Sequence, residues 1–116
     1  MRLAEFENFK IYSGLKNPAN LLQVPAEGNV LRYLYPESTI KIADFVKPAP
    51  QEDSVIWTDW DLSGIEDGFF DGVFSITPIH HADEQQTKRY LHGALRVLRP
   101  GGVIVFAEPE FDSKVV

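Results

Sequence analysis

The stretch at residues 70–108 constrains the fold more than any other part of the chain. It contains an apolar segment at 70–76, an amphipathic segment after Asp83, the turn Pro100-Gly101-Gly102 and a second apolar segment at 103–107. This pattern predicts a strand, a helix and a second strand. Two strands joined through a helix run parallel, and parallel strands need a sheet that is covered on both faces.

The predicted helix has both a start signal and an apolar face. Asp83 is the predicted N-cap, and Gln86 stands three residues later as its capping-box partner. Apolar residues then recur at intervals of three and four, which gives one apolar stripe; they are Tyr90, Leu91, Ala94, Leu95 and Leu98. Arg96 and Arg99 fall near the end of the helix, where positive charge complements the helix dipole.

The rest of the chain adds shorter elements to this unit. Strands are expected at 9–12, 39–43 and 55–58, a helical turn at 19–24 and a helix at 29–35. At 116 residues and 44% hydrophobic composition, we expect a single domain at 1–116. This order of elements predicts an α/β fold with a mostly parallel sheet flanked by helices.

The composition argues against several kinds of partner and binding site. The formal net charge is −6, which argues against nucleic acid as the main partner and is compatible with a small-molecule ligand. The chain has no cysteine and no membrane-length apolar run, so we expect no thiolate metal site, no membrane partner and a cytoplasmic location. A short sheet leaves an edge or face to cover, which predicts a homodimer.

Candidate site residues follow from the predicted sheet. Ligands of open α/β sheets bind outside the carboxyl ends of the strands. The residues just after each predicted strand are Ser13-Gly14, Asp44, Asp59-Trp60-Asp61 and the stretch from Ser75 to His81.

Three motifs in the second half of the chain resemble a known family. They are Phe70-Asp71-Gly72-Val73-Phe74-Ser75-Ile76, Ile79-His80-His81 and Arg96-Val97-Leu98-Arg99-Pro100-Gly101-Gly102. Together they resemble the second half of class I (Rossmann-like) S-adenosylmethionine-dependent methyltransferases, from about residue 55 to 108. The resemblance implies a reduced Rossmann-like fold and S-adenosylmethionine as the cofactor.

The resemblance also implies roles for three residues. Asp59 matches the acid after the third strand that accepts a hydrogen bond from the adenine amino group, with Asp61 as the alternative. Trp60 would stack on adenine, or it is a core or interface tryptophan. Asp44 matches the acid after the second strand that holds the ribose hydroxyls, or it is a surface charge at a strand end.

One family motif is missing. The family has an acidic residue followed by Gly-x-Gly-x-Gly after its first strand, whereas the first fifty residues here contain only Gly14 and Gly28. The best remnant is the segment around Gly14, which we therefore interpret as a cofactor-binding candidate.

The two adjacent histidines have two interpretations. His80 and His81 would hold a substrate or act as a base, because histidine titrates near neutrality, or they are packing and hydrogen-bonding residues. A metal site with His92 is not expected, because adjacent histidines rarely converge on one ion. Two function hypotheses stay open: a methyltransferase with an unidentified acceptor, and a non-catalytic methyltransferase-like binding or scaffold domain.

Overall fold

The structure is a computed structural model that describes residues 13–26, 30–46, 54–76, 82–108 and 111–115. Its strands form one six-stranded sheet in the order β3-β2-β1-β4-β5-β6. The first five of these strands are parallel and β6 pairs antiparallel with β5. The elements along the chain are β1 (Asn20–Val24), α2 (Val30–Leu34), β2 (Thr39–Asp44), β3 (Val55–Trp57), β4 (Phe70–Ile76), α3 (Glu84–Val97), β5 (Leu98–Glu108) and β6 (Phe111–Val115).

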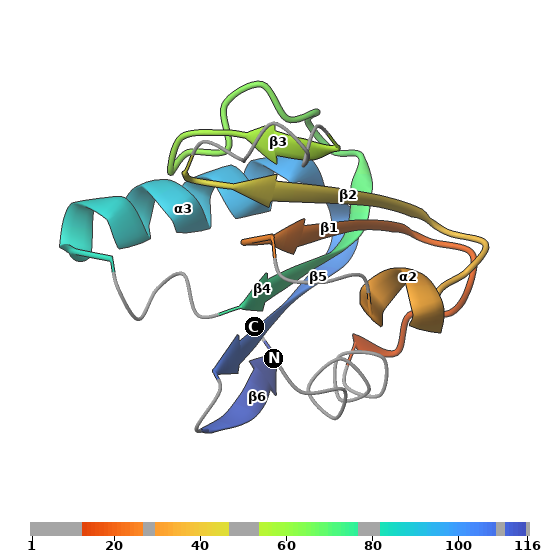
Figure 1. Cartoon of the computed structure of the whole chain (residues 1–116). Helices are drawn as coiled ribbons and strands as arrows, with labels where there is room; N and C mark the ends of the chain where they lie inside the picture. Colours follow the sequence, from red (N-terminus) through yellow and green to blue (C-terminus); the bar gives the residue numbers. More distant parts are fainter. Residues whose placement is uncertain (1–12, 27–29, 47–53, 77–81, 109–110, 116) are drawn as a thin grey trace.

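The sheet is covered on both faces, as a parallel sheet requires. Figure 1 shows α3 on one side of the sheet and α2 on the other. The α3 side buries the larger core, in which Tyr90 and Ala94 of the helix pack with Val73 of β4. On the α2 side, Leu31 and Tyr35 pack with Leu21, Phe74 and Val105. The α/β class with a mostly parallel sheet is therefore confirmed.

The unit at 70–108 has the order that the sequence predicts. Asp83 is the N-cap of α3, and its carboxylate and the Gln86 side chain form the complete capping box. The turn at Pro100–Gly102 differs from the prediction, because β5 already begins at Leu98 and the turn lies inside the strand as an irregularity in its pairing with β4. Gly101 takes a φ of 84° there, a conformation that favours glycine.

The prediction of a helical turn at 19–24 is wrong. This segment is β1, the strand between β2 and β4 near the middle of the sheet. Its last four residues are all buried, so the sequence shows neither the alternation of a half-exposed strand nor a helical period. The helix expected at 29–35 is confirmed as α2, and the strand expected at 9–12 lies outside the described residues.

The connection from β3 to β4 is an ordered loop, described throughout its length at 58–69. Leu62 and Ile65 are buried from this loop against α3. Arg96 of α3 donates hydrogen bonds to the carbonyl oxygens of Leu62 (2.8 Å) and Ile65 (2.9 Å), and it pairs with the carboxylate of Asp67. Arg96 thus binds the loop to the helix, a role beyond its predicted complement to the helix dipole.

A second arginine joins neighbouring strands at the amino ends of the sheet's central strands. Arg99 pairs with the carboxylate of Asp71 at the start of β4. The other oxygen of Asp71 accepts the backbone N–H of Asn20, the first residue of β1, at 2.7 Å. Asp71 therefore fixes the amino ends of the two central strands.

Candidate functional site

The carboxyl end of β2 lies beside the chain that leaves β1. Asp44, the last residue of β2, accepts the backbone N–H of Ala26 through Oδ2 at 3.2 Å. Its Oδ1 accepts the N–H of Phe45 at 2.7 Å. A half-buried carboxylate thus joins the two strand ends at which ligands of such sheets bind.

Asp59 follows β3 by two residues and carries an exposed carboxylate. Oδ1 accepts the N–H of Trp60 at 2.7 Å, and Oδ2 lies 3.0 Å from a guanidinium nitrogen of Arg89 on α3. The hydrogen bond from Trp60, and then Arg89, hold the pKa of Asp59 below its usual value. Asp59 is therefore a charged hydrogen-bond acceptor at neutral pH.

A hollow of about 420 Å³ lies between the end of β2 and the loop after β3. It is lined by Phe45, Trp57, Thr58, Asp59 and Ser63. The indole of Trp57 is 61% exposed, which is unusual for so large an apolar side chain. Aromatic faces next to one carboxylate suit a flat ring that carries an amino group.

Trp60 packs away from the lining of this hollow. Its ring stacks on that of Phe45, with centroids 4.1 Å apart and planes inclined by 14°. Phe45 in turn meets Tyr90 edge to face at 5.8 Å. Trp60 therefore supports Phe45 in the way expected of a core tryptophan, and Phe45 and Trp57 are the aromatic residues at the hollow.

Ser75 is buried near the end of β4, where its hydroxyl pairs with that of Tyr90. Burial raises the pKa of Tyr90, so this phenol stays neutral. The pair joins β4 to α3 behind Phe45, and the structure thus places Ser75 in the core under the site.

Gly14 lies before β1, the first strand among the described residues, and the strand after which it was predicted, at 9–12, is outside them. The carbonyl of its neighbour Leu15 accepts a hydrogen bond from Tyr35, just after α2. The loop that does follow β1 reads Pro25-Ala26-Glu27-Gly28-Asn29 and has one glycine. His80 and His81 lie outside the described residues.

Sequence reasoning missed five of the residues at this hollow and its rim, which are Phe45, Trp57, Thr58, Ser63 and Arg89. Phe45 had a signal, because it directly follows the candidate Asp44 at a strand exit. Trp57 and Thr58 fall in the strand predicted at 55–58, which marked neither of them as a site residue. Ser63 gave no signal, since the loop at 58–69 has no periodic pattern that would place it. Arg89 reads as an ordinary charge on an exposed helix face, and only the packing of α3 against this loop brings it to Asp59.

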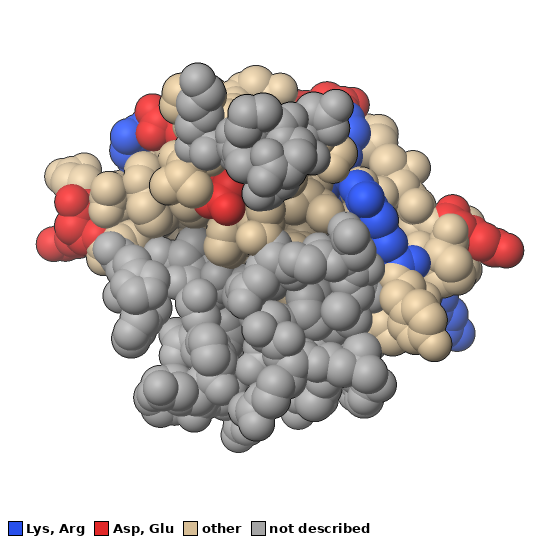
Figure 2. Space-filling view, in the orientation of Figure 1, with Lys and Arg blue, Asp and Glu red and all other residues tan. Residues whose placement is uncertain are grey.

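Charge on the surface is mixed. On the face seen in Figure 2, the acidic and basic side chains of the described residues form small separate groups. Among the described residues, no helix is long and apolar enough to cross a membrane.

A family model described as a methyltransferase domain matches residues 19–106. The chain belongs to this methyltransferase domain family. The match begins just before β1 and ends within β5, so it covers the parallel part of the sheet and the hollow. No curated protein matches the sequence.

Solved methyltransferases share the fold of this family member. The 1,6-didemethyltoxoflavin-N1-methyltransferase of Burkholderia thailandensis, with bound S-adenosylhomocysteine, is 19% identical with a TM-score of 0.68, over 89% of this chain and 49% of its own. N-methyltransferase NodS of Bradyrhizobium japonicum is 19% identical with a TM-score of 0.65, over 90% and 65%.

A protein of Pyrococcus horikoshii is 18% identical with a TM-score of 0.70, over 89% of this chain and 52% of its own. At these identities the likeness shows the fold alone. The chain spans about half the length of two of these structures, 49% and 52%, and 65% of the length of NodS.

Proposed function

We propose that this methyltransferase domain binds S-adenosylmethionine at the carboxyl edge of its sheet, with the adenine in the hollow beside Asp59. The observation that carries the proposal is the exposed Asp59 carboxylate, which lines a hollow together with Phe45 and Trp57. The solved B. thailandensis methyltransferase of the same fold holds S-adenosylhomocysteine, which supports a nucleoside ligand for this chain.

The lining residues fit an adenosyl group chemically. The faces of Phe45 and Trp57 offer apolar contact to a flat base. Asp59 would accept a hydrogen bond from the adenine amino group, and a charged acceptor strengthens such a bond. Asp44 would accept from the ribose hydroxyls, because a carboxylate has about four acceptor positions and the backbone N–H groups leave some of them open.

Methyl transfer would require little acid–base catalysis from these residues. The sulfonium of the bound cofactor supplies an activated methyl group, so the chain would contribute mainly binding and alignment of the acceptor. His80 and His81 stay predictions as acceptor-binding residues, and the acceptor is unidentified.

The second candidate is a non-catalytic methyltransferase-like domain that has lost the cofactor. One observation favours it: the loop after β1 has a single glycine, and Pro25 at its start has no N–H to donate. In the family a glycine-rich loop lets the backbone approach the methionine part of the cofactor. Such a domain would keep the hollow without binding the ligand.

Titration calorimetry separates the two candidates. We expect wild-type protein to bind S-adenosylmethionine and S-adenosylhomocysteine, and Asp59→Asn to weaken both by about tenfold, because a charged acceptor is lost. Glu66→Gln is the matched control, since this exposed carboxylate belongs to the same loop and pairs with Lys41 instead.

Two results would contradict the cofactor proposal. Folded wild-type protein that gives no binding at millimolar ligand would leave the non-catalytic domain. Equal affinity of the Asp59→Asn variant and the wild type would place the adenine elsewhere.

Self-association and location stay predictions. A homodimer in solution is tested by the mass from light scattering at working concentration, and a monomer mass contradicts it. The cytoplasmic location is tested by fractionating the source cells.

A further inference from the structure

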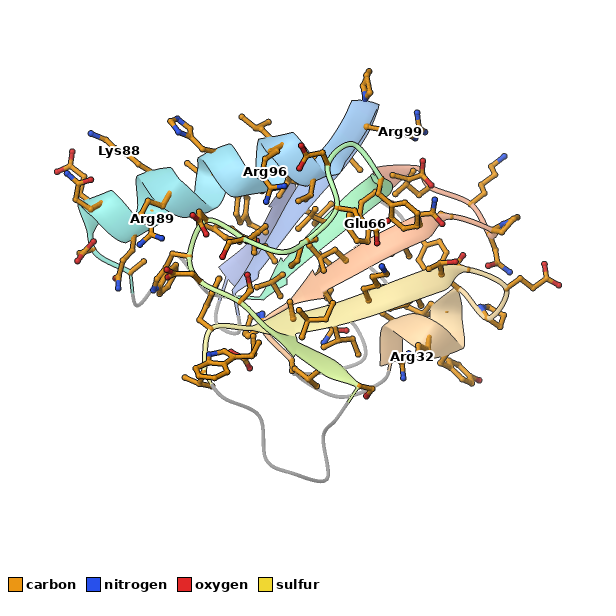
Figure 3. All side chains as sticks on the ribbon, turned by 90° about the horizontal axis from the view of Figure 1, so that it is seen from above. Arg32, Glu66, Lys88, Arg89, Arg96 and Arg99 are labelled. Atoms are coloured by element: carbon orange, nitrogen blue, oxygen red, sulfur yellow. The ribbon has the colours of Figure 1, made fainter. Side chains whose placement is uncertain are left out.

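Arg89 is the cation closest to the candidate adenine acceptor among the contacts of the described residues. Figure 3 shows Arg89 on the side of α3 that faces the loop after β3. One nitrogen of its guanidinium lies 3.0 Å from Oδ2 of Asp59 and 3.6 Å from Oδ2 of Asp61. A single cation on the helix thus serves two carboxylates of the loop.

We infer that Arg89 is a positioning residue of the cofactor site, which holds the Asp59 carboxylate in the orientation that accepts the adenine amino group. The inference rests on the proposed function, because it gives Arg89 a part in recognising the same ligand. Arg89 itself does not line the hollow.

The contacts leave room for the ligand. Oδ1 of Asp59 accepts from Trp60 and Oδ2 from Arg89, so two of about four acceptor positions are in use. An amino group can therefore bind the same carboxylate while Arg89 stays in place. The two contacts are made to different oxygens of the carboxylate and limit its rotation, so less conformational entropy is lost when the ligand binds.

Arg89 also offsets the repulsion between Asp59 and Asp61. Asp59 and Asp61 carry like charges two residues apart, and without a cation they would repel each other. Asp61 also accepts the backbone N–H of Ser63 at 3.0 Å. Arg89 therefore draws together the loop from Asp59 to Ser63, which forms one wall of the hollow.

The test compares two ligands that differ at the adenine amino group. S-adenosylhomocysteine carries this group, and S-inosylhomocysteine has a carbonyl oxygen in its place. We expect wild-type protein to prefer the adenosyl ligand, and Arg89→Gln to reduce this preference about threefold, as befits an exposed ion pair. Arg89→Lys should restore part of the preference, because it keeps the charge.

Lys88→Gln is the matched control on the same helix. Lys88 pairs with Glu84 one turn away and is itself exposed, so its loss should leave the preference unchanged. An Arg89→Gln variant that is folded and keeps the full wild-type preference would overturn the inference. A loss of affinity that is equal for both ligands would also overturn it, because it would show a general effect on the site.

A second measurement needs no ligand. Within the part of the chain that the structure describes, Arg89 from α3 is the charged group paired with Asp59, and it also pairs with Asp61 of the same loop. Carboxyl-carbon NMR should therefore show a higher pKa of Asp59 in Arg89→Gln than in wild type. An unchanged Asp59 pKa overturns the role of Arg89, whereas wild-type protein that binds neither ligand overturns the proposed function.

Discussion

Replacing Gly93 with alanine is expected to destabilise the fold by about 2 kcal/mol, even though alanine favours helices. Gly93 is buried in α3, where a Cβ atom would lie 2.3 Å from the carbonyl oxygen of Asp61 and 2.6 Å from its carbonyl carbon. Both atoms are backbone, so no side chain can rotate out of the way, and either the helix or the loop must move. Helix propensity alone would add about 1 kcal/mol of stability, which the clash exceeds.

Urea denaturation measures this effect through the midpoint and slope of unfolding. His92→Ala is the matched control, because His92 is the exposed neighbour of Gly93 and gains helix propensity without a clash. The account would be wrong if Gly93→Ala were as stable as the wild type. The same variant should also weaken S-adenosylhomocysteine binding, since Asp61 lies in the chain between Asp59 and Ser63, which both line the hollow.

Replacing Arg96 with alanine is expected to cost about 2 kcal/mol and to loosen the loop between β3 and β4. The variant removes a charged donor from the carbonyl oxygens of Leu62 and Ile65, and both of these residues are buried under α3. Leu62 also has a φ of 58°, a left-handed conformation that costs energy for a residue other than glycine. Arg96 therefore stabilises the loop at the residue that takes this unfavourable conformation.

Hydrogen exchange locates the effect. The N–H of Ile65 donates to the carbonyl of Leu62 at 3.1 Å, and its exchange should become faster in Arg96→Ala than in wild type. Asp67→Asn is the control that removes only the exposed ion partner of Arg96, and we expect it to change stability by no more than about 0.5 kcal/mol. Equal effects of the two variants would show that the carbonyl contacts contribute nothing.

The unit at 70–108 was predictable because its helix has a clear apolar period and a capping box, both of which act locally. The segment at 20–24 was not, because a strand buried on both faces carries no period. That error also kept the residues that follow Val24 out of the candidate site, because no strand was expected to end there. The position of a strand within a sheet depends on the strands that pair with it, and the residues of the strand itself do not indicate which strands these are.

In the candidate site, too, some residues could be predicted from local sequence signals and others depend on contacts between distant residues. Asp44 and Asp59 could be proposed from strand order, since carboxyl ends of parallel strands meet at one edge. The hollow itself depends on an aperiodic loop that Arg96 binds to α3, and on a Trp60 ring that stacks on Phe45. Contacts between residues 15 to 35 positions apart create both features, so the sequence alone did not reveal Trp57, Ser63 or Arg89 as neighbours.

Amide NMR of the wild-type protein during titration with S-adenosylhomocysteine tests the central claim most directly. The account predicts that the signals of the Trp57 indole and of the Thr58 and Trp60 backbone shift with increasing ligand. Signals at the opposite edge of the sheet, such as those of Asn17 and Ser38, should stay in place. Shifts confined to that opposite edge, or no shifts at millimolar ligand, would contradict the account.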